Sequence, residues 1–187
     1  MKKNILVSVK LTLVLILICA VVYPILIAGI SKAAPGGGKG ETITVNGKVV
    51  GYEKIGQQFT DDKYFWGRPS AVSYNTAGSG GSNKGPSNPD YLQLVNDRID
   101  SFLVHNPGIK KNEIPSEMVT ASGSGLDPDI SPAGAFVQVK RIATIRNLPE
   151  ENVKALVTKH IQKPLAGMLG PSRVNVLKLN IALDKLK

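Results

Sequence analysis

The hydrophobic residues of this chain form one long unbroken block followed by several shorter periodic stretches. The block runs from Leu11 to Ile30 without a charged residue and ends at Ser31 and Lys32. Twenty residues of helix rise about 30 Å, which matches the hydrocarbon thickness of a bilayer. The pattern therefore predicts one membrane-spanning helix over residues 11–30, and no later stretch is long and apolar enough for a second.

The charges around this block predict its orientation. Short basic flanks resist translocation, so we expect residues 1–10 in the cytoplasm and the chain beyond the span outside. The basic residues before the block are Lys2, Lys3 and Lys10. A cleaved secretory signal is the alternative, because small residues that suit a processing site follow the block. The block is longer than the roughly 7 to 15 apolar residues of a signal peptide, which favours an uncleaved anchor.

Within the span, small or flat residues recur at a spacing of four. Ala20, Pro24 and Ala28 share one face of a regular helix, and Tyr23 lies beside Pro24. We predict that this face packs against a helix of another protein, with the Tyr23 hydroxyl as a polar contact. The alternative is a lipid-facing helix in which the alanines are incidental.

The residues after the span predict a tether and then a hairpin. Residues 31–40 are rich in glycine, which is typical of a flexible linker. The strand-like runs Thr42–Val45 and Lys48–Tyr52 are joined by Asn46 and Gly47, which accommodate the positive φ angles of a tight turn. The domain at residues 41–187 is therefore expected to open with a hairpin.

Three later stretches show the apolar spacing of helices. The first begins after the capping residue Asn88 and ends near Pro107; its apolar stripe is Leu92, Val95, Ile99 and Phe102. The second begins after Ser131; its inward residues are Phe136, Val139, Ile142 and Ala143, and its polar side is Gln138, Arg141 and Thr144. The third runs from Pro149 to about His160 and buries Val153, Leu156 and Val157.

The last strong element is a predicted strand at Val174–Leu179, which is dense in β-branched and aliphatic residues. The predicted fold class is thus α+β: a single N-terminal transmembrane helix followed by one extracytoplasmic mixed helix/strand domain. The only cysteine, Cys19, lies in the span, so this domain has no disulfide and is held by packing.

Charge and chemistry narrow the function classes. The chain carries +9, and without the three lysines before the span 20 basic residues face 14 acidic ones, or +6. The basic residues are dispersed and not interleaved with aromatic residues, which argues against nucleic acid as a partner. His105 and His160 lie near predicted helix ends, without other ligands at metal-binding spacing. No serine has the strand-elbow-helix context of a hydrolase nucleophile, and no firmly bound cofactor is expected.

A long irregular stretch at residues 64–89 is the remaining candidate for function. Stretches of this length inside a domain are functional or disordered. Its aromatic residues, Tyr64, Phe65, Trp66 and Tyr74, suggest one hypothesis, an anchored module that binds envelope ligands on an aromatic platform.

Several blocks of the chain together resemble a known family, the C subunit of the bacterial potassium-transporting P-type ATPase, the Kdp system. The blocks are Tyr23-Pro24, residues 47–51, 55–57 and 64–71, residues 79–83 with 85–89, residues 119–128 and residues 173–177. The two long middle blocks are highly specific. They cover, with the others, nearly the whole chain.

The resemblance implies a non-catalytic subunit of the bacterial cytoplasmic membrane. Its implied partners are a channel-like potassium-translocating subunit, an ATP-hydrolysing P-type subunit, a small single-span subunit and the lipid bilayer. It also implies roles in assembly and as a catalytic chaperone that raises the ATP affinity of the hydrolysing subunit. ATP would then be bound only in the complex, and the position matching the family's proposed nucleotide contact is Gln138.

This implied contact conflicts with the predicted orientation. The lysine asymmetry places Gln138 outside, whereas ATP is consumed inside the cell. We give the orientation more weight, and an alternative role consistent with it is a domain placed over the external entrance of the channel subunit.

Overall fold

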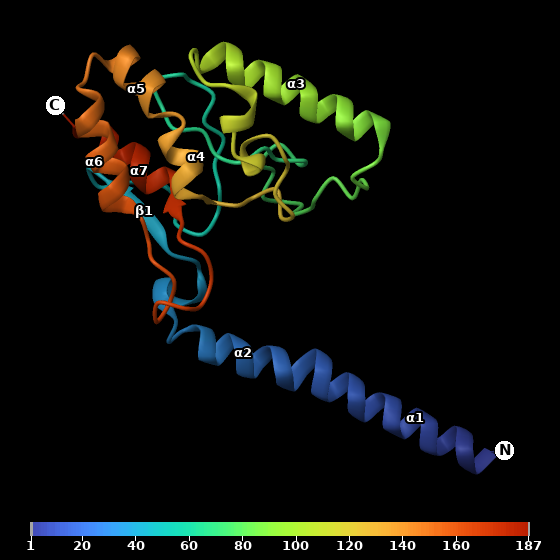
Figure 1. Cartoon of the computed structure of the whole chain (residues 1–187). Coiled ribbons are helices and arrows are strands. Elements are labelled where there is room, and N and C mark those ends of the chain that lie inside the picture. The colour runs from blue at the N-terminus through green and yellow to red at the C-terminus, as the bar shows by residue number, and fades with distance from the viewer. Residues whose placement is uncertain (1, 187) are drawn as a thin grey trace. The chain divides into compact units, whose positions relative to one another are not determined.

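The computed structural model describes residues 2–186 and divides into two compact units, with the boundary in the sequence between Thr42 and Ile43. The first unit is dominated by one long helix (Figure 1). It comprises α1 (Lys2–Ile16), a π-helical segment (Leu17–Val22) and α2 (Tyr23–Ser31). Residues Lys3–Ser31 are long and apolar enough to cross a membrane. The helix therefore begins well before the predicted start at Leu11, because nothing in the preceding residues breaks it.

The π-helical segment has a local cause. Pro24 lacks an N–H group, so the carbonyl of Ala20 loses its regular helical donor. The N–H of Tyr23 instead bonds to the carbonyl of Ile18, five residues earlier. Ala20 lies inside this widened turn, whereas Pro24 and Ala28 lie in α2. The four-residue spacing of a regular helix therefore joins Pro24 to Ala28 but does not strictly extend to Ala20.

The second unit opens with the predicted hairpin. β1 (Thr42–Val45) and β2 (Lys48–Tyr52) form a two-stranded sheet. The connecting Asn46 and Gly47 have φ angles of 50° and 77°, as a tight turn with two left-handed residues requires. This prediction is confirmed.

Residues 53–88 follow without a helix or strand, and α3 (Pro89–His105) comes next. As predicted, the side chain of Asn88 caps α3 by accepting a hydrogen bond from the Tyr91 N–H at 3.0 Å. Phe102 is buried, but Leu92 at the other end of the predicted apolar stripe is 48% exposed. Two 3-10 turns, Lys111–Glu113 and Ser116–Met118, lead on from α3.

The single helix predicted after Ser131 is two helices in the structure. Ser131 caps α4 (Pro132–Phe136), and α5 (Val139–Arg146) begins after a break at Gln138. The side chains that point inward also differ from the predicted set. Phe136, expected to be buried, is 39% exposed, whereas Gln138 and Arg141, expected on the polar side, are 0% and 5% exposed. The inward placement of Val139, Ile142 and Ala143 is confirmed.

The strand predicted at Val174–Leu179 is wrong beyond its first two residues. β4 (Val174–Asn175) pairs antiparallel with β3 (Asp129–Ile130), and α7 (Val176–Leu183) starts immediately afterwards. The side chain of Asn175 accepts a hydrogen bond from the Lys178 N–H and so begins the helix. Val176, Leu179 and Leu183 lie at helical spacing and are buried. The density of β-branched and aliphatic residues, from which the strand was predicted, does not distinguish a buried strand from a buried helix.

The core lies among α4, α5, α6 (Glu150–His160) and α7, which gather on one side of the unit in Figure 1, while α3 lies along another. Its fully buried side chains include one residue from the irregular stretch, Phe65; the helices and short strands supply Ile130, Val139, Ile142, Val153, Val157, Val174, Leu179 and Leu183. The predicted burial of Val153 and Val157 is confirmed. The unit mixes helices and strands and follows one N-terminal apolar helix, which confirms the predicted α+β class. The extracytoplasmic placement of the domain stays a prediction.

Candidate functional site: the Phe65–Trp66 loop and its cavity

Two amide side chains hold the irregular stretch against the helices at consecutive residues. Asn180 of α7 accepts a hydrogen bond from the Phe65 N–H at 2.8 Å and donates one to the Phe65 carbonyl at 3.0 Å. Gln138 accepts from the Trp66 N–H at 2.8 Å and donates to the Trp66 carbonyl at 3.2 Å. Each amide thus pairs with the backbone as a neighbouring strand would, and the two together fix the loop that carries Trp66.

Gln138 has two further hydrogen bonds within the chain. Its Nε2 donates to the Gly134 carbonyl at 2.8 Å, and its Oε1 accepts from Nη2 of Arg141 at 2.7 Å. Both donor hydrogens and the amide oxygen are therefore used. The sequence pattern predicted that this side chain lies on the polar face of a helix, and this prediction is wrong. The Gln138 side chain is buried, and its amide is fully hydrogen-bonded within the chain.

Arg141 is the centre of a buried polar network. Its Nε donates to Oδ1 of Asn106 at 2.9 Å, its Nη1 donates to the Asp62 carbonyl, and its guanidinium lies 4.4 Å from the centre of the Trp66 ring. Burial lowers the pKa of Arg141 to about 10. The nearest carboxylate compensates part of the desolvation, since Nη1 lies 3.7 Å from Oδ1 of Asp62.

Asp62 links this network to α3. Its Oδ2 lies 3.0 Å from Nδ1 of His105, the last residue of that helix. The His105 ring also contacts the Trp66 ring edge-on, with 5.0 Å between their centres. Trp66 is therefore covered by Arg141 on one side and flanked by His105, so it is not an open stacking surface. Phe65 is fully buried, and the predicted aromatic platform does not form one exposed face.

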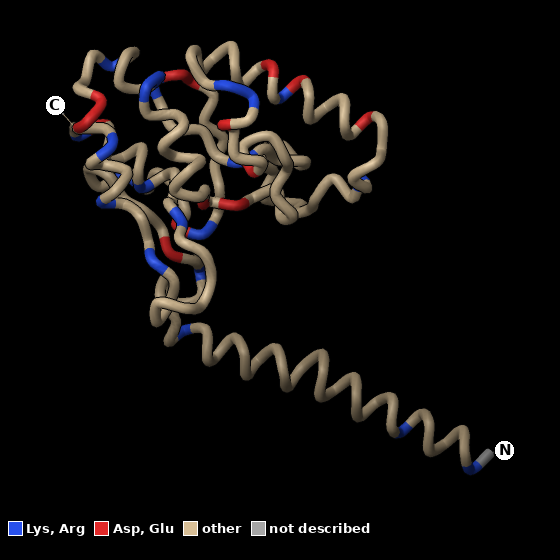
Figure 2. The backbone as a smooth tube through the Cα atoms, viewed as in Figure 1, with Lys and Arg blue, Asp and Glu red and all other residues tan. Residues whose placement is uncertain are grey.

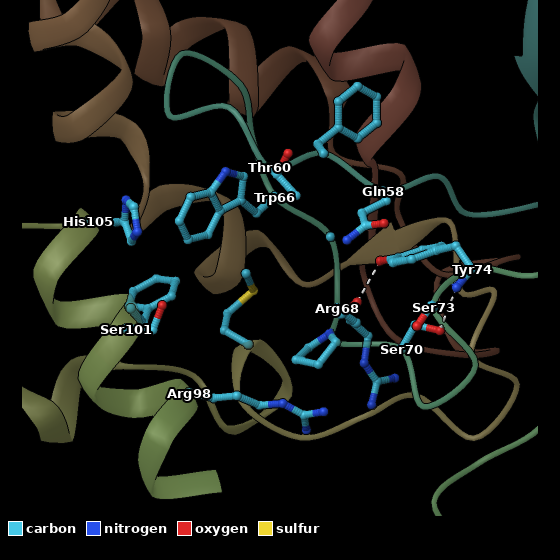
Figure 3. Close-up of a pocket in the computed structure, with 15 residues that line it drawn as sticks. Gln58, Thr60, Trp66, Arg68, Ser70, Ser73, Tyr74, Arg98, Ser101 and His105 are labelled. Atoms are coloured by element: carbon cyan, nitrogen blue, oxygen red, sulfur yellow. Dashed lines mark hydrogen bonds between the residues drawn. The ribbon is translucent and has the colours of Figure 1, made fainter. Parts of the chain in front are cut away.

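A cavity of about 400 Å³ lies beside this network (Figure 3). Trp66 and His105 border it on one side and Tyr74 on the other, with Arg68 and Arg98 at its lower edge in the view. Phe102 and Met118 supply apolar wall. The cavity therefore combines cationic and apolar surface, which suits a ligand or partner side chain that carries a negative group.

The two arginines at this cavity differ in their partners. Arg68 forms an ion pair with Asp127, with 3.0 Å between Nη1 and Oδ2. Arg98 donates to the Val119 carbonyl at 3.2 Å, and within residues 2–186 no carboxylate forms an ion pair with it. Burial lowers the pKa of Arg98. Tyr74 donates to the Arg68 carbonyl at 2.5 Å, and burial, with the nearby Asp127 charge, raises the pKa of its hydroxyl to about 12.

The two long sequence blocks of the middle of the chain lie against each other. The N–H of Gly80 and the hydroxyl of Ser79 both donate to the Ser124 carbonyl at 2.9 Å. The Ser70 hydroxyl donates to the Gly125 carbonyl at 2.7 Å. The glycine-rich segment thus docks one loop on another through Ser79 and Gly80.

The predicted membrane packing residues lie in the other unit. Tyr23, Pro24 and Ala28 are in α2, and Ala20 is in the π-helical segment before it. The exposed large apolar side chains between Ile5 and Ile30 have exposed fractions from 43% to 69%. Such a surface is expected to meet lipid or another helix. The packing face itself stays a prediction.

Sequence reasoning missed four members of the site: Asp62, Asn106, Arg141 and Asn180. Asn106 and Asn180 are 2% exposed, and both carry side-chain amides, like Gln138. The available signal was a polar residue in an otherwise apolar periodic stretch, as with Asn180 between Leu179 and Ile181. Within the described residues, no group of three or more His, Cys, Asp or Glu side chains is placed to hold a metal ion.

Comparison with known proteins identifies the family. The model of the family described as "KdpC: K+-transporting ATPase, c chain" matches residues 5–185. A potassium-transporting ATPase KdpC subunit of Flavobacterium psychrophilum is 63% identical over 185 residues, covering 99% of this chain and all of the relative. Proteins of the same name from Bacteroides fragilis and Caldanaerobacter subterraneus are 51% and 50% identical, covering 99% and 94% of this chain and 98% and 92% of the relatives. The membrane-length helix and these full-length matches agree with the resemblance of the sequence blocks, and the chain belongs to the KdpC family of K+-transporting ATPase subunits.

Proposed function

We propose that this chain is a non-catalytic accessory subunit of a high-affinity, ATP-driven potassium uptake complex and that its anchored domain stabilises the assembled complex. The family match and the one membrane-length helix support this proposal. The proposed partners are the channel-like subunit, the ATP-hydrolysing P-type subunit, which carries the chemistry, and the small single-span subunit. The proposed location is the bacterial cytoplasmic membrane, with the N-terminus inside and the domain outside, from the lysines that precede the span.

The single observation that supports a structural role best is the saturation of Gln138. Its amide makes hydrogen bonds to Trp66, Gly134 and Arg141 and is 0% exposed. A direct nucleotide contact by Gln138, with an effect on ATP affinity, stays a prediction. Such a contact would have to break bonds that hold the Trp66 loop, which leaves buried groups unpaired at about 1–3 kcal/mol each. We therefore propose that Gln138 is a positioning residue for the loop and for the cavity wall formed by Trp66.

The experiment compares Gln138→Ala with Asn180→Ala. Both residues pair with the loop backbone, but only Gln138 is a candidate for nucleotide contact, so Asn180 is a matched control. The tagged full-length chain is purified from potassium-starved cells in mild detergent. The measurements are the subunits that co-elute, the potassium-stimulated ATP hydrolysis and its KM for ATP.

A positioning role predicts that wild type recovers the channel and P-type subunits stoichiometrically. Both variants then lower this recovery together, and the KM for ATP in the recovered complex stays at the wild-type value. A KM that rises several-fold for Gln138→Ala alone would support the nucleotide contact instead. A wild-type chain that elutes alone would reject the assembly role and favour an anchored module for envelope ligands.

A further inference from the structure

The loop between α6 and β4 exposes three large apolar side chains at its tip. Leu165, Met168 and Leu169 are 74%, 82% and 64% exposed. The tip is a defined turn, because Leu165 and Leu169 exchange two backbone hydrogen bonds of 3.0 and 2.9 Å. Ala166 and Gly167 inside the turn have φ angles of 53° and 76°. The turn geometry itself therefore holds the three side chains out into the surroundings.

The base of this loop is pinned to the domain. Gln162 and Arg173 form an antiparallel bridge with backbone hydrogen bonds of 2.8 and 3.0 Å. Figure 1 shows the segment between them as an arm that extends away from α6 and α7. Single exposed apolar residues are common on soluble proteins, but three within five residues on a projecting arm form a contiguous patch. Such patches mark sites of interaction with a protein or a membrane.

The charge around the arm indicates the kind of partner. The chain has no Asp or Glu from Asn152 to Leu183. Lys159 and Lys163 are exposed near the base of the arm. Figure 2 shows that elsewhere in this unit acidic and basic residues are interspersed. An apolar tip with basic residues behind it is the arrangement that binds the interface of an anionic bilayer.

The tether keeps the domain near a bilayer. Residues 32–41 lie between the end of α2 and the start of β1. Even fully extended, ten residues span at most about 35 Å. A chain whose long apolar helix crosses the membrane therefore keeps the start of β1 within this distance of the lipid surface.

We propose that the loop tip Leu165–Leu169 inserts into the interfacial region of the lipid bilayer, with Lys163 facing anionic headgroups. The inserted tip is a second point of attachment, and it limits the rotation of the domain about its tether. This inference goes beyond the assembly role and concerns lipid, not a protein subunit.

The test uses the full chain in nanodiscs, labelled with an environment-sensitive fluorophore at Met168→Cys in a Cys19→Ser background. Ala77→Cys is the control position, because Ala77 is exposed on a loop of the same unit. The discs contain phosphatidylcholine with or without one third phosphatidylglycerol, and quencher is attached to the acyl chains of the lipid. Unfolding midpoints of all variants are compared with wild type, and we expect no shift because the altered loop side chains are exposed.

Insertion predicts a blue-shifted emission at position 168 and quenching at least threefold stronger than at position 77. The quenching decreases when Leu165→Asp and Leu169→Asp are added and when Lys163→Glu is placed in anionic discs. Equal quenching at the two positions would overturn the proposal. The same measurement in the purified transport complex separates lipid from protein: loss of quenching there would show that another subunit covers the tip, and it would also overturn the proposal.

Discussion

The two hydrogen bonds between Asn180 and the backbone of Phe65 allow the loss of stability in a variant to be predicted quantitatively. Asn180→Leu keeps a side chain of similar size but removes the groups that pair with the Phe65 N–H and carbonyl, at 2.8 and 3.0 Å. These are the only hydrogen bonds that residues 2–186 make to that backbone. Phe65 is 0% and Asn180 2% exposed, so water does not replace the lost partner without a change of structure.

The expected cost follows from the number of groups left unpaired. Each buried polar group without a partner costs about 1–3 kcal/mol, so two such groups destabilise the domain by about 2–6 kcal/mol. Typical domains are stable by about 5–15 kcal/mol, so the loss is a large share of the total. The unfolding midpoint should fall by about 4–24 °C, at roughly 2–4 °C per kcal/mol for a chain of this size.

The assay is denaturation of the full chain in detergent, followed by tryptophan fluorescence. Trp66 is the only tryptophan and is adjacent to Phe65, so the signal comes from the loop itself. Asn96→Leu is the matched control, because Asn96 is exposed on α3 and surface substitutions change stability by about 0.5 kcal/mol or less. A loss below about 1 kcal/mol for Asn180→Leu, equal to that of the control, would refute the reasoning and show that other contacts hold the loop.

Three further predictions test the cavity, the docked loops and the span. Burial raises the pKa of Tyr74 to about 12, so between about pH 10 and 12 its hydroxyl keeps its proton in the folded state and loses it in the unfolded state. The contribution of Tyr74 to the free energy of unfolding should therefore decrease as the pH rises through this range. Ultraviolet titration should show one late-ionising tyrosine that Tyr74→Phe removes. Gly125→Ala should destabilise the domain by about 2–4 kcal/mol in thermal melts, because Gly125 has a φ of +68° and an added Cβ would lie 2.5 Å from a valine methyl; Gly78→Ala, with open space around it, should be neutral, and equal melts would contradict this account. Ala28→Phe should reduce recovery of the complex several-fold through loss of close helix packing, whereas Leu26→Phe on the opposite face should not, and unchanged recovery for both would argue against the packing face.

Local patterns predicted the elements whose causes are local. The apolar block gave a long helix because twenty uncharged residues favour it regardless of context, and the Asn46-Gly47 turn and the Asn88 cap follow from the conformations of single residues. The same reasoning failed for the segment after Asn175. There the burial of Leu179 and Leu183 against the core decides between strand and helix. The local amino-acid composition carries no information about that tertiary contact.

The site was less accessible to sequence reasoning than the elements around it. Gln138 was singled out, but its partners are the backbone of Trp66, 72 residues earlier, and the side chain of Arg141. Helical spacing places Gln138 on the same face as the buried Ala135 and Ile142, but its amide is stable there only because the distant backbone of Trp66 supplies hydrogen bonds. The sequence by itself determined the long apolar helix, the hairpin and the α+β class, because the residue patterns behind them act over short distances. Which polar residues are buried, and what they hold, was decided by the tertiary structure, since a buried amide or guanidinium is stable only where distant segments supply its hydrogen bonds.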